Sequence, residues 1–93
     1  MKKEVIENLI ASSLLAAVSE VKLDKAIHPE RYFFIDEEML AFQIAARCAE
    51  KIKVAAREER LATEDELCDE NQWMKLRHHL AAEISHQITG LMN

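Results

Sequence analysis

Apolar residues recur at helical spacing over three long stretches of this chain, and one proline and one glycine are the only strong helix breakers. From about Lys3 to Lys22, a wheel of 100° per residue places the apolar side chains within one half of the helix circumference. The pattern predicts a first helix with a wide buried face. That face comprises Val5, Ile6, Leu9, Ile10, Leu14, Ala16, Ala17, Val21 and Leu23.

A second helix is predicted from Asp36 to about Leu61. Asp36 suits the N-cap because its carboxylate can accept a hydrogen bond from a backbone N–H of the first turn. Apolar residues follow every four positions with alanines beside them, and a stripe so rich in alanine lets another helix approach closely. The stripe comprises Leu40, Ile44, Cys48 and Ile52, with Ala41, Ala45, Ala49, Ala55 and Ala56.

The third helix is predicted to start at Thr63, or at Asp69 after one irregular turn. Thr63 and Glu66 match a capping box, in which a hydroxyl precedes a Glu by three residues. Gly90 is expected to end the helix. Its apolar arc comprises Trp73, Leu76, Leu80, Ile84, Ile88 and Leu91.

Three long helices with short connectors predict an all-α fold, an antiparallel three-helix bundle that forms a single domain over residues 1–93. The apolar faces of the first two helices are wider than a minimal core needs. We therefore expect the bundle to pair into a homodimer, in which a second copy covers the excess.

The connector between the first two helices is unusually aromatic. Pro29 disfavours helix at the preceding residue, and Tyr32, Phe33 and Phe34 follow within a few positions. Such a segment should either cover one end of the bundle as a lid, which we favour, or contact a partner. Under the second alternative these three aromatic residues are partner-binding residues.

Charge argues against generic nucleic-acid binding. The chain has 12 basic and 17 acidic residues, a formal net charge of -5, which is the wrong sign for a surface that follows phosphates. Five basic residues of the second helix are interrupted by glutamates and describe an ordinary solvated face. These basic residues are Arg47, Lys51, Lys53, Arg57 and Arg60.

Five carboxylates gather near the start of the third helix. Stabilisation of the helix dipole explains several of them, and a docking surface for a basic partner is the alternative. The cluster comprises Glu64, Asp65, Glu66, Asp69 and Glu70.

Arg77 projects near the middle of the apolar arc of the third helix, where a guanidinium seldom stays unpaired. We expect it either to pack within the chain, against a core carboxylate or with its head in solvent, or to meet an acidic group of a partner.

His79, Glu83 and His86 share one face of the third helix at i, i+4 and i+7, which suggests a metal site. That face points away from the apolar arc, so we interpret it as solvated and expect no metal or other cofactor. Cys48 and Cys68 are expected to be free core thiols in a reducing compartment.

Lys2 and Lys3 followed by an apolar run loosely imitate a secretory signal, but Glu4 and Glu7 fall where such a signal lacks acidic residues. No apolar run approaches the roughly 18 residues that a membrane span needs. We expect a cytoplasmic protein that does not enter a membrane.

No phosphate loop, zinc signature or nucleophile motif is present, so we predict no enzymatic activity and no catalytic residue. The sequence favours a small helical interaction or regulatory module, an adaptor or inhibitor that binds another protein. A dimeric nucleic-acid-associated regulator is the first alternative, and a helical metal or small-ligand protein is the second.

Overall fold

The one proline and the capping residues of the chain divide it into helices of very different length. The computed structural model describes residues 3–92. The all-helical prediction is confirmed, since no strand occurs in the described range. The elements are α1 (Lys3–Ile27), the 3₁₀ helix η1 (Pro29–Tyr32), α2 (Glu37–Glu58), α3 (Glu64–Leu67) and α4 (Glu70–Met92).

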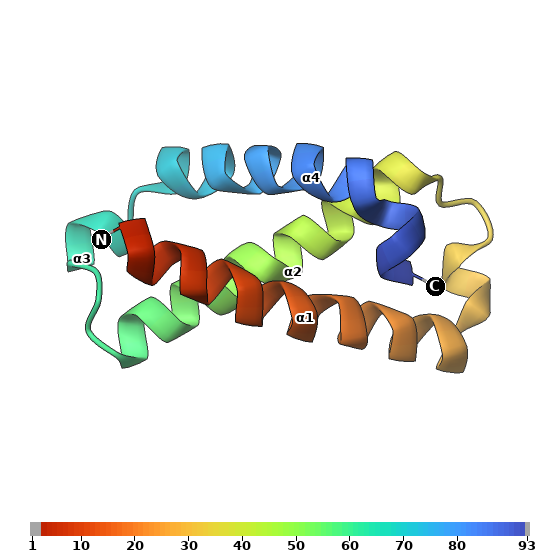
Figure 1. Ribbon diagram of the computed structural model, residues 1–93, viewed down its shortest axis with the longest axis horizontal. Helices are drawn as coiled ribbons and strands as arrows, with labels where there is room; N and C mark the ends of the chain where they lie inside the picture. Colours follow the sequence, from red (N-terminus) through yellow and green to blue (C-terminus); the bar gives the residue numbers. More distant parts are fainter. Residues whose placement is uncertain (1–2, 93) are drawn as a thin grey trace.

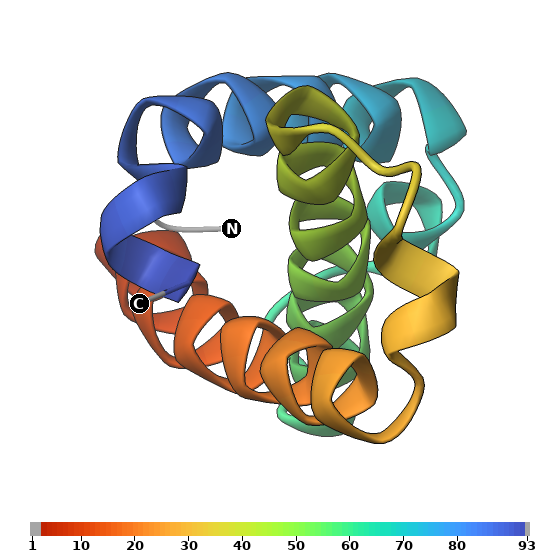
Figure 2. The same cartoon turned by 90° about the vertical axis from the view of Figure 1, so that its right-hand side faces the viewer.

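α2 lies between the two other long helices and packs against both (Figure 1). α1 and α4 run in one direction and α2 runs in the other. The end view shows that α1 and α4 stay apart for most of their length and approach where the last turns of α4 bend towards α1 (Figure 2). One hydrophobic core joins all of the α-helices, and its fully buried members are mostly residues of α2. The largest are Ile44, Ile52, Val21 and Cys48.

α1 is longer than predicted and buries a narrower face. It continues to Ile27, where the N–H of His28 donates to the carbonyl of Asp24 at 2.7 Å before Pro29 begins η1. Pro29 disfavours helical conformation only at the residue before it, His28, so α1 extends up to Ile27. Two predicted members of the buried face, Ala16 and Leu23, are exposed, because α1 packs mainly against α2.

The remaining members of that predicted face divide into three groups. Ala17 and Val21 are fully buried, while Leu9, Ile10 and Leu14 are partly buried against the core. The side chains of Val5 and Ile6 lie outside those that the structure describes.

The N-terminus of α2 is as predicted, but its C-terminus is not. Asp36 Oδ1 accepts a hydrogen bond from the N–H of Met39 at 2.8 Å, which confirms the N-cap. The helix ends at Glu58 rather than Leu61, because Arg60 adopts a left-handed conformation with φ 56°. The N–H of Leu61 then bonds to the carbonyl of Ala56 at 2.8 Å, the Schellman arrangement that closes a helix.

Both predicted starts of the third helix are realised as separate features. The capping box of Thr63 and Glu66 forms the one-turn helix α3. α4 then begins after Asp69, whose carboxylate accepts from the N–H of Gln72 at 3.3 Å. The predicted end at Gly90 is wrong: its φ is not positive, so it does not form a left-handed cap, and α4 continues to Met92.

Trp73 connects α3 to α4. Its indole Nε1–H donates to the carbonyls of Glu66 and Leu67, each at 3.1 Å, while the ring is buried in the core. These are carbonyls at the end of a helix, which have no partner within that helix. The indole therefore holds the short helix against the long one.

Candidate functional site

The aromatic connector does not form the predicted lid. Phe33 is 71% exposed and Phe34 is 94% exposed, so both rings face solvent. Met39 and Phe42, in the first two turns of α2, are 50% and 41% exposed. We call these four residues the aromatic end of the molecule, since the connector and the start of α2 lie at the same end in Figure 1.

Tyr32 behaves differently from its two neighbours because it is fastened to α1. Its hydroxyl donates to Asp24 Oδ2 at 2.5 Å, and Arg31 Nη1 lies 3.1 Å from Asp24 Oδ1. The bond from Tyr32 is the main cause that holds the pKa of Asp24 below its usual value, with the Arg31 charge adding to it. Partial burial, reinforced by the carboxylate, raises the pKa of Tyr32.

This attachment explains why the neighbouring rings are exposed. The chain around Tyr32 is tightly turned, with the N–H of Arg31 bonded to the carbonyl of His28 at 3.1 Å and that of Ile35 bonded to the carbonyl of Tyr32 at 3.3 Å. Consecutive side chains of such a turn point in different directions. One aromatic residue therefore packs against α1, and the next two project outward.

Separate hollows lie along the contact between α2 and α4, one of them at the aromatic end, and we call them together the groove. At that end Phe42 packs against His78, with ring centroids 5.9 Å apart and the planes inclined by 56°. Around this pair lies a hollow of about 500 Å³ that also includes Glu38, Ala82 and His86. A second hollow of about 450 Å³, mainly apolar, lies beside Met39 and Phe42 on α2.

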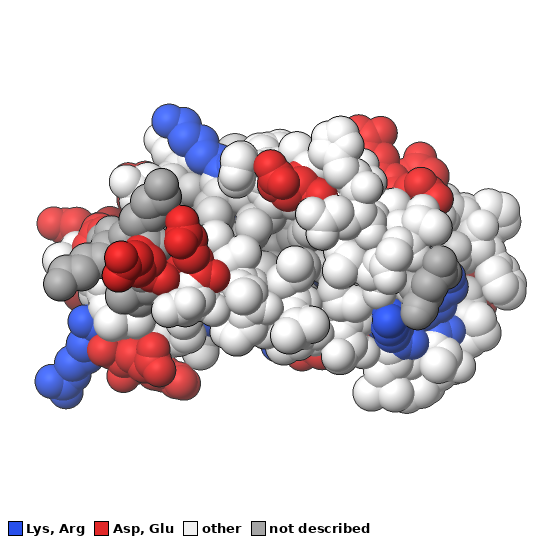
Figure 3. Space-filling model, viewed as in Figure 1, with Lys and Arg blue, Asp and Glu red and all other residues white. Residues whose placement is uncertain are grey.

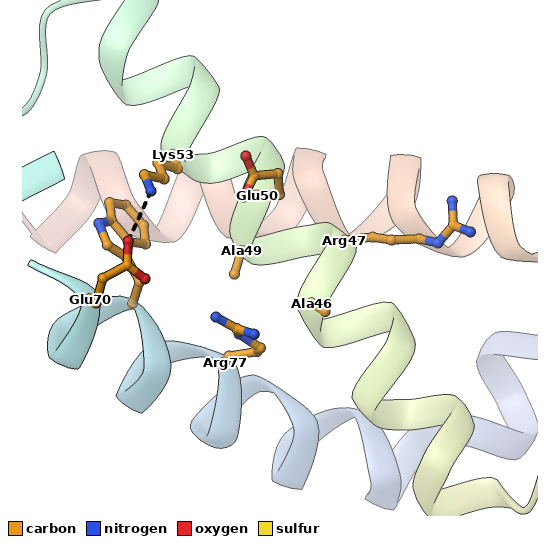
Figure 4. Close-up of a pocket in the computed structure, with 8 residues that line it drawn as sticks. Ala46, Arg47, Ala49, Glu50, Lys53, Glu70 and Arg77 are labelled. Carbon is orange, nitrogen blue, oxygen red and sulfur yellow. Dashed lines mark ion pairs between the residues drawn. The ribbon is translucent and has the colours of Figure 1, made fainter. Parts of the chain in front are cut away.

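Arg77 occupies the next part of the same groove (Figure 4). A hollow of about 350 Å³ separates α2 from α4 there, and Arg77 points into it from α4 towards Ala49, while Ala46 also lines it. Because both residues are alanines, the hollow stays open; longer side chains at these two positions would fill it. Phe42 precedes Ala46 by one helical turn, so the hollows beside Phe42 and Arg77 follow one another along α2.

The half-buried guanidinium of Arg77 has no ion pair with any residue in the described range. No core carboxylate pairs with it there, so that form of the intrachain expectation is wrong. Arg47 and Glu50 also line the hollow, but Arg47 points away from Arg77. The arrangement can accept a carboxylate at Arg77, since a guanidinium offers several N–H donors to one.

Three cations of α2, in contrast, are paired with acids on neighbouring helices. Lys51 Nζ lies 2.8 Å from Glu20 Oε1, and Arg47 Nη1 lies 3.7 Å from Glu20 Oε2. The bond from Lys51 is the main cause that lowers the pKa of Glu20. Lys53 Nζ is 3.7 Å from a Glu70 oxygen and also lies over the Trp73 ring, 6.0 Å from its centroid. The sequence suggested pairing with glutamates on α2, whereas these pairs join α2 to α1 and α4.

Three members of the predicted acidic cluster have local structural roles. The N–H of Thr63 donates to Glu66 at 3.0 Å, which is the main cause that lowers the pKa of that carboxyl. Asp69 caps α4, and Glu70 pairs with Lys53. Glu64 and Asp65 are exposed in the first turn of α3. Interactions within the fold thus explain much of the cluster.

The three side chains that the sequence suggested as possible metal ligands, and that we expected to be solvated, do not converge. His79, Glu83 and His86 are all exposed. Within residues 3–92, the structure brings together no group of three or more His, Cys, Asp and Glu side chains that could hold a metal ion.

The two cysteines are free, as predicted, but only one belongs to the core. Cys48 is fully buried and lies close to the carbonyl of Ile10, whereas Cys68 is exposed at the end of α3. Burial raises the pKa of the Cys48 thiol to about 11.

Comparison of the chain with protein-family models, with curated proteins and with solved structures found no match. Among the described helices, none combines the length and the apolar character needed to cross a membrane.

Proposed function

We propose that this chain is a protein-interaction module, an adaptor or inhibitor that binds another protein at the aromatic end and along the groove between α2 and α4. The observation that carries the proposal is the exposure of Phe33 and Phe34, at 71% and 94%, beside Met39 and Phe42. Large apolar side chains gathered on a surface favour a binding partner, because burial of each contributes about 1.5–3 kcal/mol.

The groove gives the proposed partner a second point of recognition. An apolar helix or extended segment that covers Phe42 would pass over Arg77 one turn further along. A carboxylate on that segment would pair with the guanidinium. Exposed Glu64 and Asp65 on α3 are a separate candidate contact for a basic group of the partner.

The nucleic-acid alternative receives less support from the same geometry. Arg47, Lys51 and Lys53, the first three of the five basic residues named for the predicted second helix, are paired with Glu20 and Glu70. Phosphate binding would have to break these pairs or act beside carboxylates. Salt separates the two functions, since phosphate contacts weaken steeply with ionic strength and an apolar interface does not.

We also propose that the three long helices act as an antiparallel bundle that pairs into a homodimer in the cytoplasm. The exposed apolar residues of α1, among them Leu15 at 70% and Leu23 at 62%, support an association on that side of the molecule. The dimer and the partner site are separate proposals with separate tests.

The partner site is tested by affinity capture from a lysate of the native host with three versions of the tagged chain. These are the wild type, the double variant Phe33→Ser/Phe34→Ser and the control Val54→Ser. Val54 is 41% exposed on α2 and follows Phe42 by 12 residues, about 18 Å along the helix.

We expect one stoichiometric protein to be captured by the wild type and the control at both low and high salt, and to be lost with the double variant. Loss of two buried phenylalanines corresponds to at least about a hundredfold weaker binding. Equal capture by all three versions, capture of no protein, or capture only of nucleic acid that salt removes would each contradict the proposal.

A further inference from the structure

The outward face of α1 has no covering element in the described part of the chain, and its middle carries no charge. Leu15, 70% exposed, lies at its centre, and the small residues Ala11, Ser12 and Ser19 around it are exposed as well. Figure 3 shows the uncharged surface across the middle of the molecule, on the side where α1 lies in Figure 1. Small residues allow another helix to approach closely.

The single acid in this part of α1 is turned away from the face. Between Asn8 and Val21 the only charged residue is Glu20, and its carboxylate is paired with Lys51 and Arg47 of α2. The uncharged character of the outward face is therefore a property of the folded helix, since the one charge nearby is satisfied within the chain.

Charges of opposite sign stand at the two ends of the same face. Glu4 and Glu7 lie near the start of α1, and Lys22 and Lys25 lie near its end. Lys22 follows Glu4 by 18 residues, and Lys25 follows Glu7 by the same interval, which is five full helical turns. Each lysine thus projects from the same side of the helix as its glutamate.

These four side chains are exposed, and none has an ion pair with a residue that the structure describes. They also form a symmetric set. The midpoint between Glu4 and Lys25, and that between Glu7 and Lys22, both fall between Leu14 and Leu15. A helix with this arrangement is complementary to an antiparallel copy of itself.

We propose that α1 binds α1 of a second copy of this chain, antiparallel, about a two-fold axis beside Leu15. Glu7 of each copy pairs with Lys22 of the other, and Glu4 pairs with Lys25, while Leu15 packs against its symmetry mate. The inference rests on the dimer of the proposed function and names its interface. A two-fold axis repeats every contact, so each charge pair occurs twice.

The size of this contact predicts a reversible dimer. The paired segment from Glu4 to Lys25 is about 32 Å long, close to the 39 Å length of the molecule. A single pair of helices with a small apolar centre is a small interface, so we expect a dissociation constant on the order of micromolar. The aromatic end is not part of it and stays free for another partner.

The test is a charge exchange followed by sedimentation equilibrium of the full chain. Glu7→Lys and Lys22→Glu, made singly, should each weaken the dimer about tenfold, because each replaces two attractions with two repulsions. The double variant Glu7→Lys/Lys22→Glu should restore wild-type affinity. Rescue within one chain is impossible, because the two residues are 15 positions, about 22 Å, apart on a single helix.

Two further variants complete the design. The Leu15→Glu variant should be monomeric at tens of micromolar. In a dimer it would place one carboxylate from each copy beside the two-fold axis, and the two would repel each other. The control Glu58→Lys, a reversal at an exposed residue of α2, should leave the dimer unchanged. Circular dichroism establishes that each variant is folded.

The outcomes separate this inference from the proposed function. A dimer that is insensitive to Leu15→Glu and to the exchange overturns the α1 interface but leaves a dimer. If the wild type is a monomer at tens of micromolar, both the dimer and its interface are overturned. The partner site at Phe33 and Phe34 is tested separately, by affinity capture. Absence of rescue in the double variant, with both single variants weakened, contradicts the antiparallel pairing.

Discussion

The Tyr32 hydroxyl donates a hydrogen bond of 2.5 Å to Asp24 Oδ2 and thereby fastens the aromatic connector to the last turn of α1. This hydrogen bond determines in which direction the side chains of the connector point. With Tyr32 held inward, Phe33 and Phe34 project into solvent, where a partner can reach them. The same bond links the stability of this end of the molecule to pH.

Tyr32→Phe is expected to lower the melting temperature by a few degrees at neutral pH and to reduce the pH dependence. The pKa of Asp24 is lowered from 3.8, so its contribution is present above that pH and is lost as pH falls through the lowered value. The pKa of Tyr32 is raised from 10.0, so its contribution is present below pH 10 and is lost at higher pH.

Thermal unfolding of Tyr32→Phe and the wild type between pH 2 and pH 11 checks this. The difference in stability should be largest between about pH 5 and pH 9 and should narrow at both extremes. Arg31→Ala, which removes only the exposed ion pair, should have a smaller effect. A difference that is constant across the range would show that the hydrogen bond is not its source.

Trp73→Phe is expected to destabilise the fold by about 1–2 kcal/mol, because the variant keeps a large ring in the core but loses the indole N–H. The Leu67 carbonyl would then lose the indole donor, and the Glu66 carbonyl would keep only the N–H of Asp69 at 3.3 Å. Urea denaturation measures the loss, and amide hydrogen exchange at Leu67 and Cys68 should rise more than exchange in the centre of α2. Uniform acceleration throughout the chain would contradict a specific role in holding α3.

Arg60→Gly is expected to stabilise the protein by about 0.5–1 kcal/mol. Arg60 has a φ of 56°, a left-handed conformation that costs free energy in a residue with a Cβ atom but not in glycine. The matched control Arg57→Gly, within the last turn of α2, should instead destabilise by up to about 1 kcal/mol. Chemical denaturation compares the two, and destabilisation by both would refute a left-handed end at Arg60.

Thiol labelling should distinguish the two cysteines. At pH 8 an aromatic disulfide reagent should modify Cys68 in the folded protein and both thiols after unfolding, because Cys48 is fully buried with a pKa raised to about 11. The folded variant Cys68→Ser should therefore show no rapid reaction. Rapid labelling of two thiols in the folded wild type would contradict the packing of α1 against α2.

The raised pKa of Cys48 also predicts a loss of stability in alkali. Its folded value lies above the unfolded value of 9.0, so the contribution is complete below pH 9 and declines as pH rises to about 11. The decline should amount to at most about 3 kcal/mol, since each pKa unit corresponds to about 1.4 kcal/mol. Denaturation of wild type and Cys48→Ala at pH 8 and pH 11 checks it, since the variant should lose less over this interval.

Features encoded by neighbouring residues were predictable from the sequence. The N-cap at Asp36 and the capping box at Thr63 and Glu66 were found because donor and acceptor lie three residues apart. The end of α2 was missed because Arg60 carries no glycine-like signal for a left-handed conformation. Gly90, which does carry that signal, lies inside α4.

The candidate site depends on contacts that are distant in sequence. Lys51 pairs with Glu20 across 31 positions, and nothing local to either residue specifies the pair. The exposure of Phe34 was only the less favoured alternative, because hydrophobicity alone favours burial and the tight turn after Tyr32 decides otherwise. Arg77 was recognised as unusual, but only the packed helices show that no carboxylate of residues 3–92 pairs with it, although Glu50 and Glu70 line the same hollow.

Site-specific photocrosslinking in the native host tests the proposed partner site most directly. A photoreactive benzoyl-phenylalanine in place of Phe34 is expected to form a crosslink to one other protein, while the same group in place of Val54 forms none to that protein. A crosslinked band at position 34 that Phe33→Ser weakens would support the aromatic end as the binding surface. No crosslink at position 34, or the same crosslinks from both positions, would contradict it.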